Sequence, residues 1–326
     1  MQRQSYVPPL FYGTTPELLS NQIREALAGG SPDQKRTDFN EFRRRMMEEV
    51  CSFPPTKMPL PKPSSERTRA SFSAMTRWMG KMIKADTDKC KFLDFMIAKA
   101  VEKCGNKLFY HNYQHMMDVV INSTILTCMW ISEGRLGDYG ANASDVLLSM
   151  ALAAAFHDTV MEHRSAPGQS EELSAQFLRE TYSLYLCLRP DLAANRFCAD
   201  PVEVAYGLIS YTVPNIRTEL RSRLDAFPLP VSDQDSRHRL SLQLGAILAD
   251  ADVMESLCLP FKNAVGITRR VKKELWDHNI DAELTLRGFY SSVTPEGFIS
   301  EPGQHLQEIF RYNRDLCVKR DLMPYS

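Results

Sequence analysis

Two of the seven histidines of this 326-residue chain, His111 and His115, stand four residues apart in the segment YHNYQH. In a helix, side chains four residues apart lie on one face, about one turn from each other. A neutral imidazole is a frequent ligand of divalent metals, and it titrates near neutral pH. The pair alone also fits two partly buried histidines at the start of a helix, so its meaning depends on partners elsewhere in the chain.

A second polar pair, His157 and Asp158, ends the apolar run VLLSMALAAAF at 146–156. A run that is apolar on every side predicts a buried helix, whose carboxyl end would bring both side chains into the interior. A buried carboxylate without a partner is costly, and metal coordination is one way to offset that cost. Neighbouring helical residues diverge by about 100°, so both reach one ion only if the helix ends there or the ion lies between them. The alternative is a helix that ends in a capping aspartate.

Two aspartates, Asp250 and Asp252, interrupt a third apolar segment, LGAILADADV at 244–253. Residues two apart on a helix point about 200° away from each other, so only one of them can face a given site. Asp252 shares a face with Leu244 and Leu248, which are predicted core residues. Asp252 is therefore the candidate for the same interior site as the histidines.

In this order, the three segments resemble the HD superfamily of metal-dependent phosphohydrolases. HNxxH followed by AxxHD is similar to the catalytic domains of class I 3′,5′-cyclic nucleotide phosphodiesterases and to small bacterial HD phosphohydrolases. Two further motifs of that group match the segments EELSA at 171–175 and DADV at 250–253. The resemblance covers residues from about 105 to about 300, and its specificity comes from the ordered combination.

The resemblance implies a fold of packed helices with the site at its centre. The positions that match the metal ligands are His115, His157, Asp158 and Asp252. His111 matches the general acid that protonates the leaving oxygen. Glu171 or Glu172 would help to hold a second ion or its waters, and His163 stands near a further phosphodiesterase histidine, although the spacing is not kept. The implied cofactors are one or two divalent ions of Mg, Mn, Zn or Fe.

The implied reaction is hydrolysis of a phosphate ester by metal-activated water, with a 3′,5′-cyclic nucleotide giving the nucleoside 5′-monophosphate. One alternative is an HD phosphohydrolase that acts on a nucleotide monoester or another phosphorylated metabolite. Another is a non-catalytic helical module that binds a nucleotide or a partner protein. That last alternative predicts a missing ligand, whereas all four are present.

The resemblance fails at the residue that reads the base. Phosphodiesterases carry a Gln-x-Gly-Phe-Ile segment, and here TPEGFIS places Pro295 where the glutamine belongs. Proline has no side-chain amide, and Gln304 and Gln307 are nearby glutamines that could substitute for it. Phe298 matches the phenylalanine and is predicted to stack on a base, the alternative being an ordinary core residue.

The elements that must position these residues follow from apolar residues at three- and four-residue spacing, while alternating strand patterns are rare. Helices are expected at 88–103, 111–133, 144–158, 168–187, 200–213, 237–258, 260–277 and 302–318. This pattern predicts an all-α, multi-helical domain of the HD/PDEase-like type over residues 87–326.

Residues 1–86 are expected to form an N-terminal helical and extended appendage. The segments 15–29 and 31–53 each begin with a cap residue followed by proline, which favours a helix start. Residues 54–69 contain five prolines and no helical period, and residues 62–84 are rich in Lys and Arg, which predicts a linker, a basic docking strap or a solvated loop. A strap over 54–86 could cover the site, dock a partner or mediate a homodimer.

The bulk composition, with 44% apolar and 24% charged residues, is that of an ordinary globular protein. A net charge of −1 gives no electrostatic reason to expect nucleic acid as a partner. Eight cysteines without a CxxC pair predict reduced core thiols. The amino terminus shows no secretory pattern, and the longest apolar run is too short to span a bilayer. We therefore expect a cytoplasmic enzyme with a small phosphorylated substrate and no membrane span.

Overall fold

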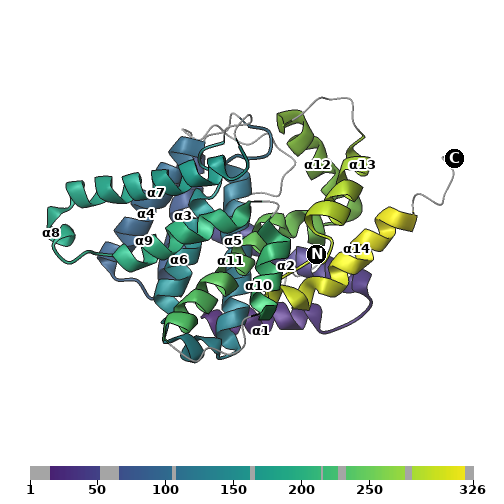
Figure 1. Ribbon diagram of the computed structural model, residues 1–326, viewed down its shortest axis with the longest axis horizontal. Coiled ribbons are helices and arrows are strands. Elements are labelled where there is room, and N and C mark those ends of the chain that lie inside the picture. Colours follow the sequence, from purple (N-terminus) through teal and green to yellow (C-terminus); the bar gives the residue numbers. More distant parts are fainter. Residues whose placement is uncertain are drawn as a thin grey trace, which may run out of the picture.

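The computed structural model describes residues 15–51, 66–104, 108–161, 166–213, 216–226, 233–275 and 281–319, and these residues form fourteen α-helices and no strand. The helices are α1 (Pro16–Leu27), α2 (Pro32–Cys51), α3 (Glu66–Met82), α4 (Thr87–Cys104), α5 (Tyr113–Ser132), α6 (Ala143–Phe156), α7 (Gln169–Leu188), α8 (Pro190–Ala193), α9 (Ala199–Ile209), α10 (Ile216–Ala226), α11 (Asp233–Cys258), α12 (Phe261–Leu275), α13 (Ala282–Gly288) and α14 (Gln307–Lys319). α7 and α8 lie at one end of the molecule, with α12, α13 and α14 at the other (Figure 1). The predicted all-α fold is confirmed.

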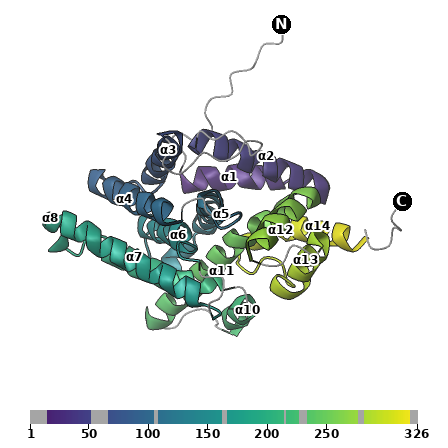
Figure 2. The same ribbon diagram turned by 90° about the horizontal axis from the view of Figure 1, so that it is seen from above.

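Two helices, α5 and α6, form the centre of the molecule. Every residue of α5 from Tyr113 to Ile131 is buried, and so is every residue of α6 from Val146 to Phe156. Both sequences are apolar around most of the helix, so they have no face that prefers water and must be covered on all sides. α1, α6 and α11 pack directly on α5, and Figure 2 shows α5 enclosed between α1 and α2 on one side and α11 on the other.

The first three helices belong to the same apolar core as the rest. Leu19 and Ile23 of α1 are fully buried, and α1 packs against α5. Thr15 caps α1 by accepting a hydrogen bond from the backbone N–H of Leu18, as its Thr-Pro start predicts. The division of the chain at residue 86 stays a prediction, although helices on both sides of it share apolar contacts.

The prediction of an extended strap over residues 54–86 is wrong from residue 66 onward, where the structure describes the chain. Residues 66–82 form α3, because Phe72, Met75, Trp78 and Met79 recur at helical spacing and bury their side chains. The prolines that suggested an extended segment precede this helix, and residues 54–65 lie outside the described residues.

Besides α3 and the four-residue α8, two described helices, α10 and α13, have no counterpart among the predicted ones. α10 is mostly polar and buries only Arg217, Leu220 and Leu224, so its apolar period is too weak to stand out in the sequence. α13 is only seven residues long. In the part of the chain that the structure describes, no helix has both the length and the apolar character needed to cross a membrane.

Candidate metal centre

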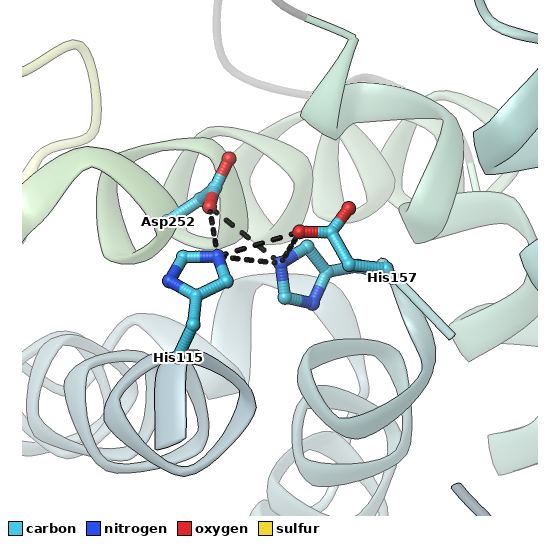
Figure 3. Close-up of side chains that lie close together, drawn as sticks. His115, His157 and Asp252 are labelled. Atoms are coloured by element: carbon cyan, nitrogen blue, oxygen red, sulfur yellow. Dashed lines mark hydrogen bonds and ion pairs between the residues drawn. The ribbon is translucent and has the colours of Figure 1, made fainter. Parts of the chain in front are cut away.

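Four side chains from three helical regions converge at the centre of the fold. His115 comes from α5, His157 and Asp158 follow the end of α6, and Asp252 comes from α11 (Figure 3). One potential ligand atom from each of the four lies within 4.8 Å of the others. The Nε2 atoms of the two histidines are 3.4 Å apart. The structure thus brings together the four residues that the sequence singled out, and their role as metal ligands stays a prediction.

Each carboxylate of the cluster touches both imidazoles. Asp158 Oδ2 lies 3.3 Å from His115 Nε2 and 3.0 Å from His157 Nε2. Asp252 Oδ1 lies 3.1 Å from His115 Nε2 and 3.5 Å from His157 Nε2. Two imidazole nitrogens and two carboxylate oxygens form a mixed donor set that suits a divalent transition metal. The cluster could therefore hold a metal ion.

The start of α5 explains how the YHNYQH segment places its histidines. Asn112 is the cap of α5, and its side-chain oxygen accepts hydrogen bonds from the backbone N–H groups of Gln114, at 2.9 Å, and His115, at 3.4 Å. His111 therefore lies just outside the helix, not on its first turn as the sequence suggested. The rings of His111 and His115 still lie close together, with 5.7 Å between their centroids.

The end of α6 positions His157 so that only one of its ring nitrogens faces the cluster. α6 ends at Phe156, and His157 occupies the position just beyond it. His157 Nδ1 lies 2.8 Å from the carbonyl oxygen of Ala154 and donates its proton there, so Nε2 is the nitrogen that faces the cluster. Because the helix ends here, the neighbouring Asp158 turns toward the same region, as the sequence argument required.

The histidines and aspartates of the cluster shift one another's pKa. Burial lowers the pKa of His115, but hydrogen bonds to Asp158 and Asp252 outweigh it and raise the pKa to about 9. The pKa of His157 is raised in the same way against burial. Burial raises the pKa of each aspartate, but the imidazoles outweigh it and lower both. Without a metal, the cluster is a set of ion pairs whose imidazole protons a metal would have to displace.

His111 has a carboxylate partner that the sequence did not reveal. Glu274, near the end of α12, contacts His111 Nδ1 and accepts hydrogen bonds from the backbone N–H groups of Tyr110, at 2.7 Å, and His111, at 3.1 Å. His111 Nε2 is then 3.9 Å from Asp158 Oδ2, so it faces the cluster. Burial raises the pKa of Glu274, but its hydrogen bond to His111 outweighs burial and lowers it.

Tyr110 is a second residue that sequence reasoning missed. Its ring lies over the ring of His115, with 4.4 Å between the centroids and 38° between the planes. Tyr110 is only 9% exposed, so its ring covers one face of His115 within the core. The signal in the sequence was the aromatic residue directly before His111.

Glu171, Glu172 and His163, which the sequence suggested near a second ion, have different surroundings. Glu171 stands in the first turn of α7, and its pKa is raised by burial and further by the charges of Asp158 and Asp252. Glu172 is exposed. Their roles stay predictions, and His163 lies outside the described residues. Ser174, in the same motif, accepts a 3.0 Å hydrogen bond from the backbone N–H of Val160 and so fixes the loop after Asp158.

The segment that would read a base is packed into the core. Phe298 is 1% exposed and belongs to the main apolar cluster. The side chain of Gln307 accepts a 2.9 Å hydrogen bond from the backbone N–H of Phe298, and Gln304 donates to the Phe298 carbonyl. Both glutamines that could replace the one missing at Pro295 thus hold the backbone of this segment. Base stacking by Phe298 stays a prediction, while the ring packs as a core residue.

Comparison with known proteins bears on the fold. The fold is similar to the solved structure of LmjPDEB1 in complex with IBMX, a class I phosphodiesterase catalytic domain, with a TM-score of 0.53. The match has 15% sequence identity and covers 91% of this chain and 97% of that chain. No family model matches the chain, and no curated protein does. At this identity the likeness establishes the fold, and the predicted HD/PDEase-like architecture is confirmed.

Proposed function

We propose that this chain, which has the fold of a class I phosphodiesterase catalytic domain, hydrolyses a 3′,5′-cyclic nucleotide to the nucleoside 5′-monophosphate with a divalent metal. The proposal is carried by one observation. Four ligand atoms from His115, His157, Asp158 and Asp252 lie within 4.8 Å of one another, with His111 facing the same cluster. Metal binding explains why two buried imidazoles and two partly buried carboxylates lie together.

The four clustered residues would hold the metal. His157 supports the assignment because its Nδ1 is committed to the Ala154 carbonyl, which leaves Nε2 for a ligand bond. A divalent ion bound there lowers the pKa of a coordinated water and offsets charge on the phosphoryl oxygens. Glu171, in the first turn of α7, is our candidate for holding a second ion or its waters. Mg²⁺, Mn²⁺, Zn²⁺ and Fe²⁺ are all compatible with nitrogen and oxygen donors of this kind.

His111 is assigned the proton transfer. Its Nδ1 faces Glu274, whose carboxylate stabilises the protonated imidazole and fixes the orientation of the ring. Its Nε2 then holds a proton on the side of the cluster, 3.9 Å from Asp158 Oδ2. As water attacks phosphorus and the bond from phosphorus to O3′ breaks, this proton passes to O3′. The alkoxide therefore leaves as a neutral hydroxyl.

A second candidate is a phosphohydrolase that acts on another phosphorylated metabolite. The observation that favours it is the engagement of Gln304 and Gln307 by the backbone around Phe298, which leaves no side-chain amide there for a purine. The same metal cluster would serve both reactions, so the two candidates differ only in what surrounds it.

The test compares substrates at one protein preparation. Cyclic AMP, cyclic GMP, bis(p-nitrophenyl) phosphate and p-nitrophenyl phosphate are incubated with the purified protein in Mg²⁺ or Mn²⁺, beside the Asp158→Ala variant. Metal-dependent turnover of the diesters that is lost in the variant supports the phosphodiesterase. Turnover of the monoester alone would replace it with the second candidate. No turnover in a folded, metal-loaded protein would rule out both.

A further inference from the structure

A pocket of about 410 Å³ lies next to the metal centre and has no part in the mechanism above. Residues of α2, α5 and α11 and the start of α12 line it. Pockets that bind small molecules commonly begin at about 300 Å³, so this one has room for a heterocycle of nucleobase size.

The pocket and the metal centre share two walls. Asp118 stands three residues after His115 on α5, and Glu255 stands three residues after Asp252 on α11. Three residues are close to one turn, so the pocket begins about 5 Å along both helices from the cluster. The two helices are tied together by a 3.0 Å hydrogen bond that Asn122 donates to the carbonyl of Ala251. A nucleotide whose phosphate lies at the cluster can therefore place its base in the pocket.

The lining combines apolar walls with hydrogen-bond acceptors. Met47, Leu259 and Pro260 supply apolar surface, which suits the faces of a flat ring. Asp118 accepts a 3.3 Å hydrogen bond from Gln114, and a carboxylate has room for more donors than this one.

A second acceptor comes from Asn40, which also lines the pocket. Asn40 Oδ1 has no hydrogen-bond partner among the described residues, while its Nδ2 donates to the carbonyls of Arg36 and Cys258.

The basic groups in the lining are already engaged. Arg43 donates to Asn122 at 2.9 Å and lies 3.8 Å from Glu255. Arg44 pairs with glutamates of its own helix at positions 41 and 48. The pocket therefore offers acceptors more than donors. Burial, and after it the charge of Glu255, raises the pKa of Asp118 to about 7, and new N–H donors would favour its ionised form.

We propose that this pocket holds the base of the nucleotide and that Asp118 accepts hydrogen bonds from N–H groups on the edge of that base. The inference rests on the proposed function and specifies its substrate. Guanine fits best, because its ring N–H and its amino group are adjacent donors that can meet both oxygens of one carboxylate. The pocket thus takes over the base recognition that Pro295 cannot provide.

The kinetic test compares cyclic GMP with cyclic IMP, which lacks the amino group, and with base-free bis(p-nitrophenyl) phosphate. In the wild type, kcat/KM for cyclic GMP should exceed that for cyclic IMP about tenfold, the effect of one hydrogen bond to a charged group. In Asp118→Asn, the two values should agree within about twofold. A preference that is absent in the wild type, or unchanged in the variant, would overturn the assignment of Asp118.

A second variant tests the pocket without touching Asp118. Met47→Trp fills the space from α2 and should lower the ratio of kcat/KM for cyclic GMP to that for the base-free diester about tenfold. Leu188→Trp, on the exposed side of α7 at 61% exposure, is the matched control and should leave the ratio unchanged. Base-free hydrolysis with a ratio that Met47→Trp does not move would reject the pocket while the proposed function stands.

A binding measurement covers the case in which no substrate is hydrolysed. Calorimetry with guanosine 5′-monophosphate and metal-free protein should show binding that Met47→Trp weakens at least about tenfold and Leu188→Trp does not change. Binding without hydrolysis would reject the proposed function and keep the pocket. Equal binding by wild type and Met47→Trp, or no binding at all, would reject the pocket.

Discussion

Asp250 and Asp252 stand two residues apart on α11 and face opposite surroundings. Asp250 is fully buried and meets only donors: Arg217 Nη2 at 2.7 Å, the Ile299 N–H at 3.1 Å, and the N–H and hydroxyl of Ser300 at 2.8 and 2.6 Å. Asp252 meets two imidazole nitrogens and shares them with a second carboxylate. The helix separates the two carboxylates because residues two apart diverge by about 200°.

This difference indicates that Asp250 has a structural role and that Asp252 is a candidate metal ligand. Asp250 is satisfied in every protonation state of its neighbours, since arginine and backbone donors keep their protons. Asp252 is satisfied only while His115 and His157 are protonated. Once those imidazoles are neutral, two carboxylates and two lone pairs face one another, and a cation is the partner that satisfies them all.

The region around Asp250 is also closely packed, and its carboxylate holds three segments together. Its carboxylate joins α10, α11 and the segment 297–300. Gly303 approaches so closely that a Cβ there would lie 2.5 Å from Asp250 Oδ2. A side chain at that position would push the segment away from the carboxylate, so glycine is required for the contact.

The largest expected effect comes from Asp252→Asn. This change keeps the shape of the side chain but removes a charged ligand, and we expect metal-dependent hydrolysis to fall about a thousandfold, equivalent to several kcal/mol of lost stabilisation. Turnover, bound metal by elemental analysis and unfolding of the metal-free protein are measured together. The metal-free variant should be less stable than the wild type by only about 1–2 kcal/mol, because it loses one of the two carboxylates that raise the pKa of the imidazoles. Activity within tenfold of wild type would remove Asp252 from the ligand set.

The matched change, Asp250→Asn, should have the opposite profile. It leaves Arg217, whose side chain is 5% exposed, without its counter-charge, and breaking such a buried pair costs about 3–5 kcal/mol. Urea unfolding measures this loss, and kcat per folded molecule should stay within about threefold of wild type. If Asp250→Asn lost activity without losing stability, the contrast between the two aspartates would be wrong.

The sequence predicted the cluster because three of its four residues interrupt a local apolar pattern and all four match the ligand positions of the family that the chain resembles. His157 and Asp158 end an apolar run, and Asp252 stands on the core face of another, so neighbouring residues alone indicated burial. The same local argument identified most of the helices around the site. It placed His111 on the helix because the capping role of Asn112 was not considered.

The partners that come from distant segments could not be predicted in this way. Glu274 lies 163 residues from His111, on α12. Arg217 belongs to a mostly polar helix that the apolar period did not reveal, so the buried pair with Asp250 had no local signal. Such contacts depend on how α5 meets α12 and how α10 meets α11, which is tertiary information.

A pH titration of stability should distinguish the two regions by an effect of intermediate size. In the metal-free protein His115 has a raised pKa of about 9, so its contribution is complete below its unfolded pKa of about 6.5 and is lost as the pH rises toward 9. We expect the unfolding free energy in EDTA to fall by on the order of 3 kcal/mol between pH 6 and pH 9. With saturating Mn²⁺ the stabilisation by metal should grow over the same window, because the imidazoles must lose their protons to bind it.

Two variants and the wild type test whether ion pairs within the cluster cause this pH dependence. The Asp250→Asn variant should keep the pH dependence, while His115→Gln should weaken it and leave the part that His157 contributes. A metal-free wild type whose stability is constant between pH 6 and pH 9 would mean that the imidazoles are neutral throughout, and the ion pairs of the cluster would then need another description.

The smallest expected effect is that of Glu274→Gln. The amide oxygen can still accept the proton on His111 Nδ1, but the negative charge that stabilises the protonated imidazole is gone. We expect kcat to fall about tenfold while KM changes little, because the proton on His111 is needed only in the transition state. Glu102→Gln, at an exposed ion pair on α4, is the matched control and should leave both values unchanged. An unchanged kcat, or a loss that lies mainly in KM, would assign Glu274 to holding the backbone at Tyr110 and His111 rather than to supporting the proton.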